Sequence, residues 1–416
     1  MAYDAVIVGA GISGLTCAKY LQRHQKSVII IDADDRIGGR IKTDTVKGFQ
    51  LDHGFQVLQT GYPEGKRSLD YNGLKLCKFP AGVAVRSKGK FHLIADPRYH
   101  IRHLYSTIAA PIGTFKDRVL MLRLARAVSS CAFTELFSQP EERTIDFLSG
   151  YGFSEGFINR FFVPFFAGAC LDRNITASSR VLKYIFRVFT QGDAALPALG
   201  MAEIPRQLAA SLPQESMRLG SRVVKIEDGG VILADGESIQ AKAVIVATSA
   251  AAEQELLGYD QEVHSVGENC LYFAGRWQPP FKEPFLILNG EENGPINNIA
   301  FPSLVAPQYA QDGRTLIAVV VLGEEYCRDP KLQEQVREQC RTWFGREVDE
   351  WEHLHTYEIR HALPSQEPPT PDPYRQPAPF SGKIWRCGEH GSLPGTQWAL
   401  LAGRMTAETM VRNKLF

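Results

Sequence analysis

The residues with the clearest chemical meaning lie in the first forty positions. An apolar run ends at Val8, and Gly9, Gly11 and Gly14 follow with the spacing GxGxxG. The first glycine permits a tight turn, the second lets the backbone approach a pyrophosphate, and the third lets the next helix pack close to a sheet. Asp32 ends a second apolar run 18 residues after Gly14 and is placed to accept hydrogen bonds from ribose hydroxyls. This strand–turn–helix context predicts a dinucleotide site.

A second glycine pair and a cation follow the acidic residue. Gly38 and Gly39 let the backbone pass close to a bound ligand, and Arg40 can neutralise phosphate charge. The amides at the start of the predicted helix face the same charge. The other residues that we expect in this nucleotide site are Ala10, Ile12, Ser13 and Ala33.

This stretch resembles the extended nucleotide motif of the superfamily of flavin-dependent amine oxidases, phytoene desaturases and protoporphyrinogen oxidases. The resemblance implies an α/β protein whose discontinuous, Rossmann-like FAD-binding domain is joined to a mixed α+β substrate domain, similar to glutathione reductase and amine oxidases. We expect the FAD-binding domain to comprise residues 1–60, 198–252 and 380–416. The substrate-binding domain would then comprise residues 61–197 and 253–379.

The middle of the chain carries a second piece of this pattern. Residues 221–236 predict two strands joined by a turn, and residues 243–248 predict a fully buried strand. This unit resembles the part that completes the FAD domain in the family, where the residue matching Val223 touches the adenine. We also expect Thr248, at the end of the buried strand, to contact the cofactor.

The third piece lies near the C-terminus. Gly388 and Glu389, followed by a small-residue helix, resemble the ending at which the family's glycine and acidic residue meet the ribityl-pyrophosphate. Glu389 replaces the usual aspartate and can make the same hydrogen bonds. In the family a helix N-terminus there points at the pyrimidine edge of the flavin, so the resemblance makes flavin-edge candidates of Thr396, Gln397 and Trp398. Trp398 stands where most members have glycine.

Residues 51–63 favour one branch of the superfamily, because they resemble a motif of the carotenoid desaturases. The glycine that matches Gly54 lies beside the isoalloxazine in that branch, and Phe55 follows it. Gln56 stands where a histidine is usual, and we predict that Gln56 and Trp398 face the substrate. We find no match to the lysine opposite flavin N5 of the amine oxidases, nor to their C-terminal tyrosine pair.

Composition excludes several classes of protein. The 416 residues carry a formal net charge of zero, which gives no electrostatic reason to expect a nucleic-acid partner. The eight cysteines form no CxxC pair, so neither a metal site nor a redox dithiol is indicated. No cysteine follows Gly388, and we expect FAD to be bound non-covalently. With no signal peptide or spanning apolar run at the N-terminus or elsewhere, we expect a cytoplasmic protein that can also contact a membrane peripherally.

Between the FAD pieces the pattern changes. Residues 116–137 have a helical pattern, and residues 153–189 are rich in phenylalanine, either as core or as the lining of an apolar substrate channel. Residues 316–322 predict a buried strand, and residues 332–343 predict a helix that stops at Gly345.

These patterns predict an FAD-dependent oxidoreductase of the desaturase or dehydrogenase type. A hydrophobic substrate would deliver hydride to flavin N5, and oxygen, a quinone or another carrier would reoxidise the flavin. No dedicated general base is required if the adjacent proton is acidic or is lost to water, and we assign no catalytic residue. Three alternatives stay open: an amine or amino-acid oxidase, a redox-neutral flavin-dependent isomerase, and a non-catalytic isoprenoid-binding escort. The intact Gly9, Gly11, Gly14 and Asp32 argue against the escort, which has no need of FAD.

Overall fold

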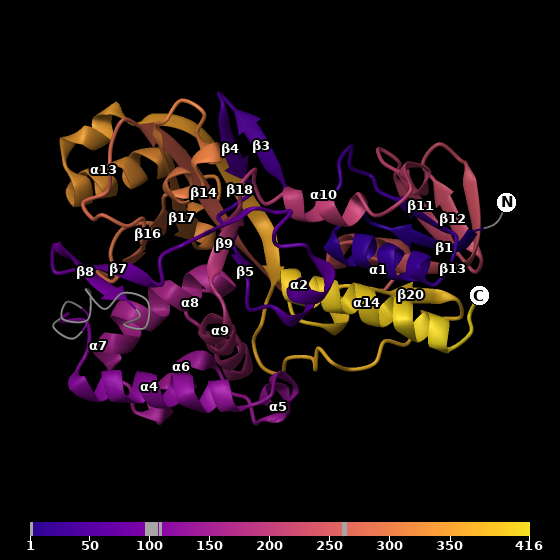
Figure 1. Cartoon of the computed structure of the whole chain (residues 1–416), viewed down its shortest axis with the longest axis horizontal. Coiled ribbons are helices and arrows are strands. Elements are labelled where there is room, and N and C mark those ends of the chain that lie inside the picture. Colours follow the sequence, from indigo (N-terminus) through magenta and orange to yellow (C-terminus); the bar gives the residue numbers. More distant parts are fainter. Residues whose placement is uncertain (1–2, 96–106, 108–109, 260–263) are drawn as a thin grey trace.

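The larger of two main sheets brings together strands from three separated parts of the chain (Figure 1). In the computed structural model, which describes residues 3–95, 107, 110–259 and 264–416, the strand order is β10-β2-β1-β13-β12-β11, with β20 beside β13 and β19 beside β20. The strands are β1 (Tyr3–Val8), β2 (Val28–Ile31), β10 (Met217–Arg218), β11 (Val223–Glu227), β12 (Gly230–Leu233), β13 (Ser238–Val246), β19 (Pro379–Ser381) and β20 (Ile384–Arg386).

The centre of this sheet is parallel. Strands β10, β2, β1, β13 and β20 run in one direction, whereas β11 and β12 extend β13 as an antiparallel meander. Strand β2 and the second half of β13 are buried along their length, which suits strands covered on both faces. The predicted α/β, Rossmann-like fold is therefore confirmed.

Close helix packing on this sheet depends on glycines. A Cβ on Gly14 would lie 2.0 Å from the carbonyl oxygen of Gly9, so the third glycine of the motif lets α1 (Ile12–Arg23) approach β1. A Cβ on Gly403 would lie 2.5 Å from the carbonyl oxygen of Ser13, where α14 (Thr396–Arg412) crosses α1. Helices α2 (Pro63–Ser68), α10 (Glu203–Ala209) and α11 (Ala250–Leu257) complete this half of the molecule.

The second sheet has the order β18-β14-β17-β16-β15-β7-β8. Its strands are β7 (Gly82–Ser87), β8 (Lys90–Ala95), β14 (Ser265–Gly275), β15 (Leu286–Asn289), β16 (Ile296–Ala300), β17 (Thr315–Leu322) and β18 (Glu352–Pro364), with α12 (Pro302–Val305) between β16 and β17. Strand β17 is buried throughout, as predicted. Helix α13 (Leu332–Phe344) buries Leu332, Val336, Cys340 and Trp343 and ends at Gly345 as predicted, where a φ of +87° suits glycine.

A helical layer lies beside the second sheet (Figure 1). Its helices are α4 (Phe115–Ser130), α5 (Phe133–Ser138), α6 (Thr144–Tyr151), α7 (Glu155–Phe157), α8 (Val163–Cys170) and α9 (Ser179–Gln191), with a π-helical turn at Ile158–Phe162. The helical pattern predicted over residues 116–137 is divided in two. The chain is extended at Cys131 and Ala132, and the Ala132 N–H donates to Glu135 Oε2, which starts α5.

Two small sheets connect the halves: β3 (Thr43–Val46) with β4 (Phe49–Asp52), and β5 (Leu58–Gln59) and β6 (Leu76–Lys78) on either side of β9 (Ala194–Pro197). Asp52 anchors this junction. It accepts hydrogen bonds from the hydroxyls of Thr43 (2.5 Å) and Tyr309 (2.7 Å) and from the Met201 N–H (2.9 Å). Burial raises the pKa of the Asp52 carboxyl to about 6, against these hydrogen bonds. The loop that follows Asp52 is thereby held in place.

The domain boundaries remain a prediction. Most strands of the larger sheet fall within residues 1–60, 198–252 and 380–416, and β19 begins one residue earlier. Parts of the predicted substrate-binding domain, residues 96–106, 108–109 and 260–263, lie outside the described residues. Within the described ranges, no helix combines the length and the apolar character needed to cross a membrane.

Candidate active site

A cavity of about 880 Å³ joins the two halves of the molecule. One part of its wall comes from the carboxyl ends of β1 and β2, at Val8 and Ile31, and another from α8, α9 and β15. Ligands of open α/β sheets bind outside the carboxyl ends of the strands. The cavity therefore lies where the sequence motifs place a dinucleotide.

The glycine turn shapes one end of this cavity. Gly9 has a φ of +112°, and a Cβ there would lie 2.6 Å from the carbonyl oxygen of Ala247, so that position requires glycine. Gly11 differs, because a Cβ there would meet nothing within 4 Å. Its open side lines the cavity directly before α1, where a pyrophosphate can approach the backbone and the helix N-terminus.

Asp32 is held beside this turn by two backbone donors. Its Oδ2 accepts a hydrogen bond from the Ala10 N–H (2.6 Å), and its Oδ1 accepts one from the Asp34 N–H (2.8 Å). The carboxylate also lines the cavity, so it can accept further hydrogen bonds from ribose hydroxyls. Val223 and Thr248 line the same cavity, and the predicted contacts of Val223 with the adenine and of Thr248 with the cofactor stay predictions.

Arg40 forms an ion pair with Glu389, across 349 residues of sequence. Arg40 Nη1 also donates to the carbonyl oxygen of Ala362 (2.8 Å). Glu389 is nearly buried, whereas the arginine side chain is half-exposed. The pair ties the second glycine motif to the C-terminal motif at the cavity wall, and Arg40 already has a carboxylate partner before any phosphate binds.

These features fit FAD. The open side of Gly11 can receive a pyrophosphate, and the oriented Asp32 can bind a ribose. All three motifs line the one cavity, as an extended dinucleotide requires. Of the described residues lining the cavity, none is a cysteine that could bond covalently to a flavin. Cys387 is buried, with its thiol directed at the carbonyl oxygen of Ser13 (3.8 Å).

The structure separates the predicted site residues into two groups. Those that line the cavity are Gly9, Gly11, Ile12, Ser13, Asp32, Ala33, Gly38, Gly39, Arg40, Phe55, Gln56, Val223, Thr248, Gly388, Glu389 and Thr396. Those that do not line it are Ala10, Gly14, Gly54, Gln397 and Trp398. Ala10 and Gly14 support the turn from behind, through the hydrogen bond to Asp32 and the close packing of α1.

The placement of Gln397 and Trp398 argues against their predicted roles at the flavin edge and the substrate. The Gln397 side chain is buried and accepts a hydrogen bond from the Glu64 N–H (2.9 Å). The Trp398 ring is also buried and packs against Tyr184 and Phe137, with ring centroids 4.7 and 5.2 Å away. Both point away from the cavity, which meets α14 only at Thr396 and Ala399.

Gln56 lines the cavity, but its amide is already engaged. Its Nε2 donates to the carbonyl oxygens of His53 (2.8 Å) and Arg40 (3.1 Å). The side chain therefore braces the loop against the second glycine motif. Its Oε1 is the atom left to meet a substrate.

The other half of the cavity is largely apolar. Helices α8 and α9 contribute aromatic rings, with Phe165, Tyr184 and Phe189 on the cavity wall, and β15 contributes Leu286 and Leu288. Other phenylalanines of the same region, Phe157, Phe161, Phe162 and Phe166, are buried as core. The aromatic segment therefore divides between core and cavity wall, and binding of an apolar substrate by that wall stays a prediction.

Glu268 is a residue of this site that sequence reasoning missed. It lies on β14, paired with Leu322 on one side and Ile359 on the other, and it lines the cavity. A Cβ on Gly54 would lie 2.0 Å from Glu268 Oε1, so Gly54 makes room for the carboxyl. Burial raises the pKa of the Glu268 carboxyl to about 8, opposed by a hydrogen bond from the Phe55 N–H. An acidic residue inside an apolar strand was the available signal.

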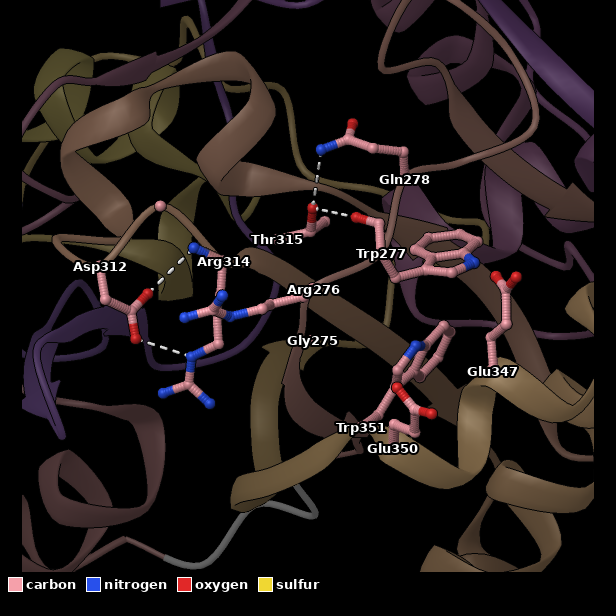
Figure 2. Close-up of a pocket in the computed structure, with 11 residues that line it drawn as sticks. Gly275, Arg276, Trp277, Gln278, Asp312, Arg314, Thr315, Glu347, Glu350 and Trp351 are labelled. Carbon is pink, nitrogen blue, oxygen red and sulfur yellow. Dashed lines mark hydrogen bonds and ion pairs between the residues drawn. The ribbon is translucent and has the colours of Figure 1, made fainter.

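A second hollow, of about 790 Å³, lies beside the second sheet (Figure 2). Its walls carry Trp277 and Trp351, whose rings are 5.0 Å apart, and Arg314, which pairs with Asp312 (2.6 Å). It shares no lining residue with the larger cavity and contains none of the predicted site residues. In the part of the chain that the structure describes, no group of three or more His, Cys, Asp or Glu residues is arranged to hold a metal ion.

The fold and the cavity together define an FAD-dependent oxidoreductase. A sequence profile of flavin-containing amine oxidoreductases matches residues 12–411, and the chain belongs to that family. The predicted superfamily and its FAD cofactor are thus confirmed, whereas the closer placement with carotenoid desaturases stays a prediction.

Individual relatives show how far the likeness extends. The structure of cyclohexylamine oxidase from Brevibacterium oxydans IH-35A superposes with a TM-score of 0.75 at 16% identity, covering 100% of both chains, which shows a shared fold. Putrescine oxidase of Kocuria rosea is 30% identical over 150 residues, which are 35% of this chain and 30% of that protein. Inactive all-trans-retinol 13,14-reductase of Danio rerio is 46% identical over 55 residues, which are 13% of this chain and 9% of that protein. These two sequence alignments span less than a third of either relative.

Proposed function

We propose that this protein oxidises a hydrophobic small molecule by hydride transfer to FAD. The observation that carries the proposal is the apolar half of the cavity, lined by Phe165, Phe189, Leu286 and Leu288. Apolar walls with few polar groups are typical of sites for lipophilic ligands. Glu268 lines the same cavity, and burial raises its pKa to about 8, so its carboxyl is mostly neutral at about pH 7.

The side chains of this chain would hold the cofactor and exclude water. Gly11 and the start of α1 would receive the pyrophosphate, Asp32 the ribose, and the Arg40–Glu389 pair would close the wall between them. Bound FAD supplies the hydride acceptor. The aromatic walls from α8 and α9 would fix the reacting carbon and keep water from it. Oxygen, a quinone or another carrier would then take the electrons.

The test is the visible spectrum of the purified protein, before and after anaerobic addition of candidate substrates. Bleaching of the flavin bands by a conjugated polyene or another lipophile supports the proposal. Bleaching by neither lipophiles nor amines contradicts it. Turnover of a polyene without use of an electron acceptor would indicate a redox-neutral isomerase, and a colourless protein that FAD cannot reconstitute would indicate an escort.

A matched pair of variants ties the result to the cavity. Ala169 on α8 is exposed into the cavity, so Ala169→Trp should block a bulky lipophile while the flavin content stays unchanged. Ala127 is exposed on α4 and does not line the cavity, so Ala127→Trp should leave bleaching as it is in the wild type. Equal bleaching in both variants would place the substrate elsewhere.

Oxidation of an amine is the second candidate. Two relatives named above are a cyclohexylamine oxidase and a putrescine oxidase, and the cavity holds a carboxyl, that of Glu268. Both Tyr62 and Tyr184 line the cavity with nearly parallel rings, 6.4 Å between centroids, a pairing that suits an amine nitrogen between or beside them. Bleaching by cyclohexylamine or putrescine, but not by polyenes, would favour this candidate.

A further inference from the structure

The surrounding backbone fixes the position of the Glu268 carboxyl in the cavity wall. Its strand is hydrogen-bonded on both sides, so the backbone holds the side chain at one place in the wall. Gly54 has a φ of +85° and leaves the space that the carboxyl occupies. The side chain is 7% exposed, and its surroundings include the loop of Phe55, which also lines the cavity.

Among the described residues, no lysine, arginine or histidine forms an ion pair with Glu268, and the Phe55 N–H is the donor that it faces. Arg40 and His53 line the same cavity, but Arg40 is already paired with Glu389, and His53 with Asp44 (2.8 Å). A buried carboxyl without a cation exchanges a proton readily near neutral pH, which is the property required of a general base.

We propose that Glu268 is the proton acceptor of substrate oxidation, an inference that rests on the proposed function. Oxidation of a saturated carbon pair, or of a carbon bonded to nitrogen or oxygen, removes one hydrogen as hydride and one as a proton. Bound FAD would supply the two-electron acceptor for the hydride. The Glu268 carboxylate takes the proton, so that an O–H bond forms as the second substrate bond to hydrogen breaks. The electron pair of that bond becomes the new double bond, and Glu268 returns its proton to solvent before the next turnover.

Titratable groups on the elements around Glu268 include Cys270 and Tyr272 on its own strand, Asp52 and His53 on β4 and the following loop, and Tyr357, Glu358 and Arg360 on β18. Burial raises the pKa of the Tyr272 and Tyr357 hydroxyls, so both stay neutral near pH 8.

Cys270, Asp52 and His53 titrate apart from Glu268. Burial raises the pKa of the Cys270 thiol well above its usual range, so that it stays neutral. Asp52 has a pKa of about 6, and burial lowers the pKa of His53, so both titrate below Glu268. Glu358 and Arg360 pair with each other at 2.7 Å. An ionisation near pH 8 therefore reports on Glu268 among these groups.

The experiment measures the rate of anaerobic flavin reduction in the wild type and in Glu268→Gln, with a conjugated polyene in detergent as the first probe. Glutamine has the shape of the acid and keeps an oxygen for the Phe55 N–H, so the variant should fold and bind FAD. In the wild type, the rate should rise with pH through about 8 and then level off. In the variant, it should fall about 100-fold or more and lose this pH dependence. Equal rates and equal pH profiles would overturn the proposal.

A second measurement does not depend on turnover. At about pH 7, where Asp52 is largely ionised, the infrared spectrum of the full-length apoprotein should contain a carbonyl band of a neutral carboxylic acid that is missing from Glu268→Gln and disappears at alkaline pH. In the wild type alone, the absence of any carboxylic-acid band that disappears as the pH rises through about 8 would overturn the proposal, even where the glutamine variant folds poorly. Glu268→Asp, which keeps the acid on a shorter chain, should recover part of the rate and the pH dependence.

Failure of the proposed function and failure of the Glu268 assignment give different results. If no lipophile or amine reduces the wild-type flavin, the proposed function fails and this inference fails with it. If a probe reduces the wild-type flavin and Glu268→Gln is reduced equally fast, the proton acceptor is a different group and the proposed function stands. Glu350→Gln, an exposed change in the second hollow, controls for the loss of one carboxylate.

Discussion

Replacing Glu268 with glutamine should make the apoprotein more stable at alkaline pH. The pKa of this carboxyl is higher in the folded chain than in the unfolded chain, because folding buries it. The folded state therefore binds more protons than the unfolded state between the two values. The stability that accompanies the neutral form is fully present below about pH 4.5 and is lost as the pH rises through about 8.

The size of the effect follows from the difference between the two pKa values. The carboxyl moves from 4.5 to about 8 on folding. At about 1.4 kcal/mol for each pKa unit, the ionised form costs up to about 5 kcal/mol above pH 8. Glutamine carries no charge at any pH, so the variant should exceed the wild type by up to this amount at about pH 9 and match it near pH 4.5.

The assay is urea denaturation of the apoprotein at a series of pH values. The apoprotein can be prepared by removing FAD, because the cofactor is non-covalent. The difference in the free energy of unfolding between variant and wild type should grow with pH and reach a plateau above about pH 8. Glu350→Gln, at an exposed position, should give a curve parallel to the wild type. Parallel curves for Glu268→Gln as well would refute the assignment of a neutral buried acid.

Three further changes test the cofactor site and its support. Gly11→Leu should lower the ratio of flavin to protein with little change in the melting temperature, because its φ of −75° suits any residue and the side chain enters open cavity. Gly14→Leu should lower the melting temperature itself, by overpacking against Gly9 at a cost of about 1–3 kcal/mol or more. Arg404→Met should lower the free energy of unfolding in urea by about 3–5 kcal/mol, because the buried Glu64 loses its two hydrogen bonds of 2.7 and 2.9 Å from Arg404. The double variant with Glu64→Gln should recover most of that loss.

The cofactor end of the site could be predicted because its signal is local. The spacing of Gly9, Gly11 and Gly14 determines where the backbone turns and how closely α1 can pack, and both follow from sterics within a few residues. The position of Asp32 follows from the length of a helix and a strand. The meeting of Arg40 with Glu389 is different, since it depends on how two sheet edges 349 residues apart come together.

For α14, the sequence motif does not determine which side chains face the cavity. The resemblance predicts that the start of α14 meets the flavin, but the direction of each side chain depends on the rotation of α14 about its axis. Residues three apart share a helix face, so Thr396 and Ala399 line the cavity together. Gln397 and Trp398 then lie on the other side, where the ring fills a gap beside Tyr184. No spacing rule in the sequence sets that rotation; the packing of α14 on α1 does.

Glu268 escaped prediction for a related reason. Strand β14 is buried continuously from Glu268 to Gly275, so its sequence lacks the alternation that would show which residues face a cavity. A charged residue near the end of such a strand is more often solvated than buried. The register with Leu322 and Ile359, and the absence of a side chain at Gly54, place this one inside. An ionisable acid in that position lowers the stability of the folded protein. Destabilising groups with shifted pKa values are typical of functional sites, which favours a role for Glu268 in proton transfer.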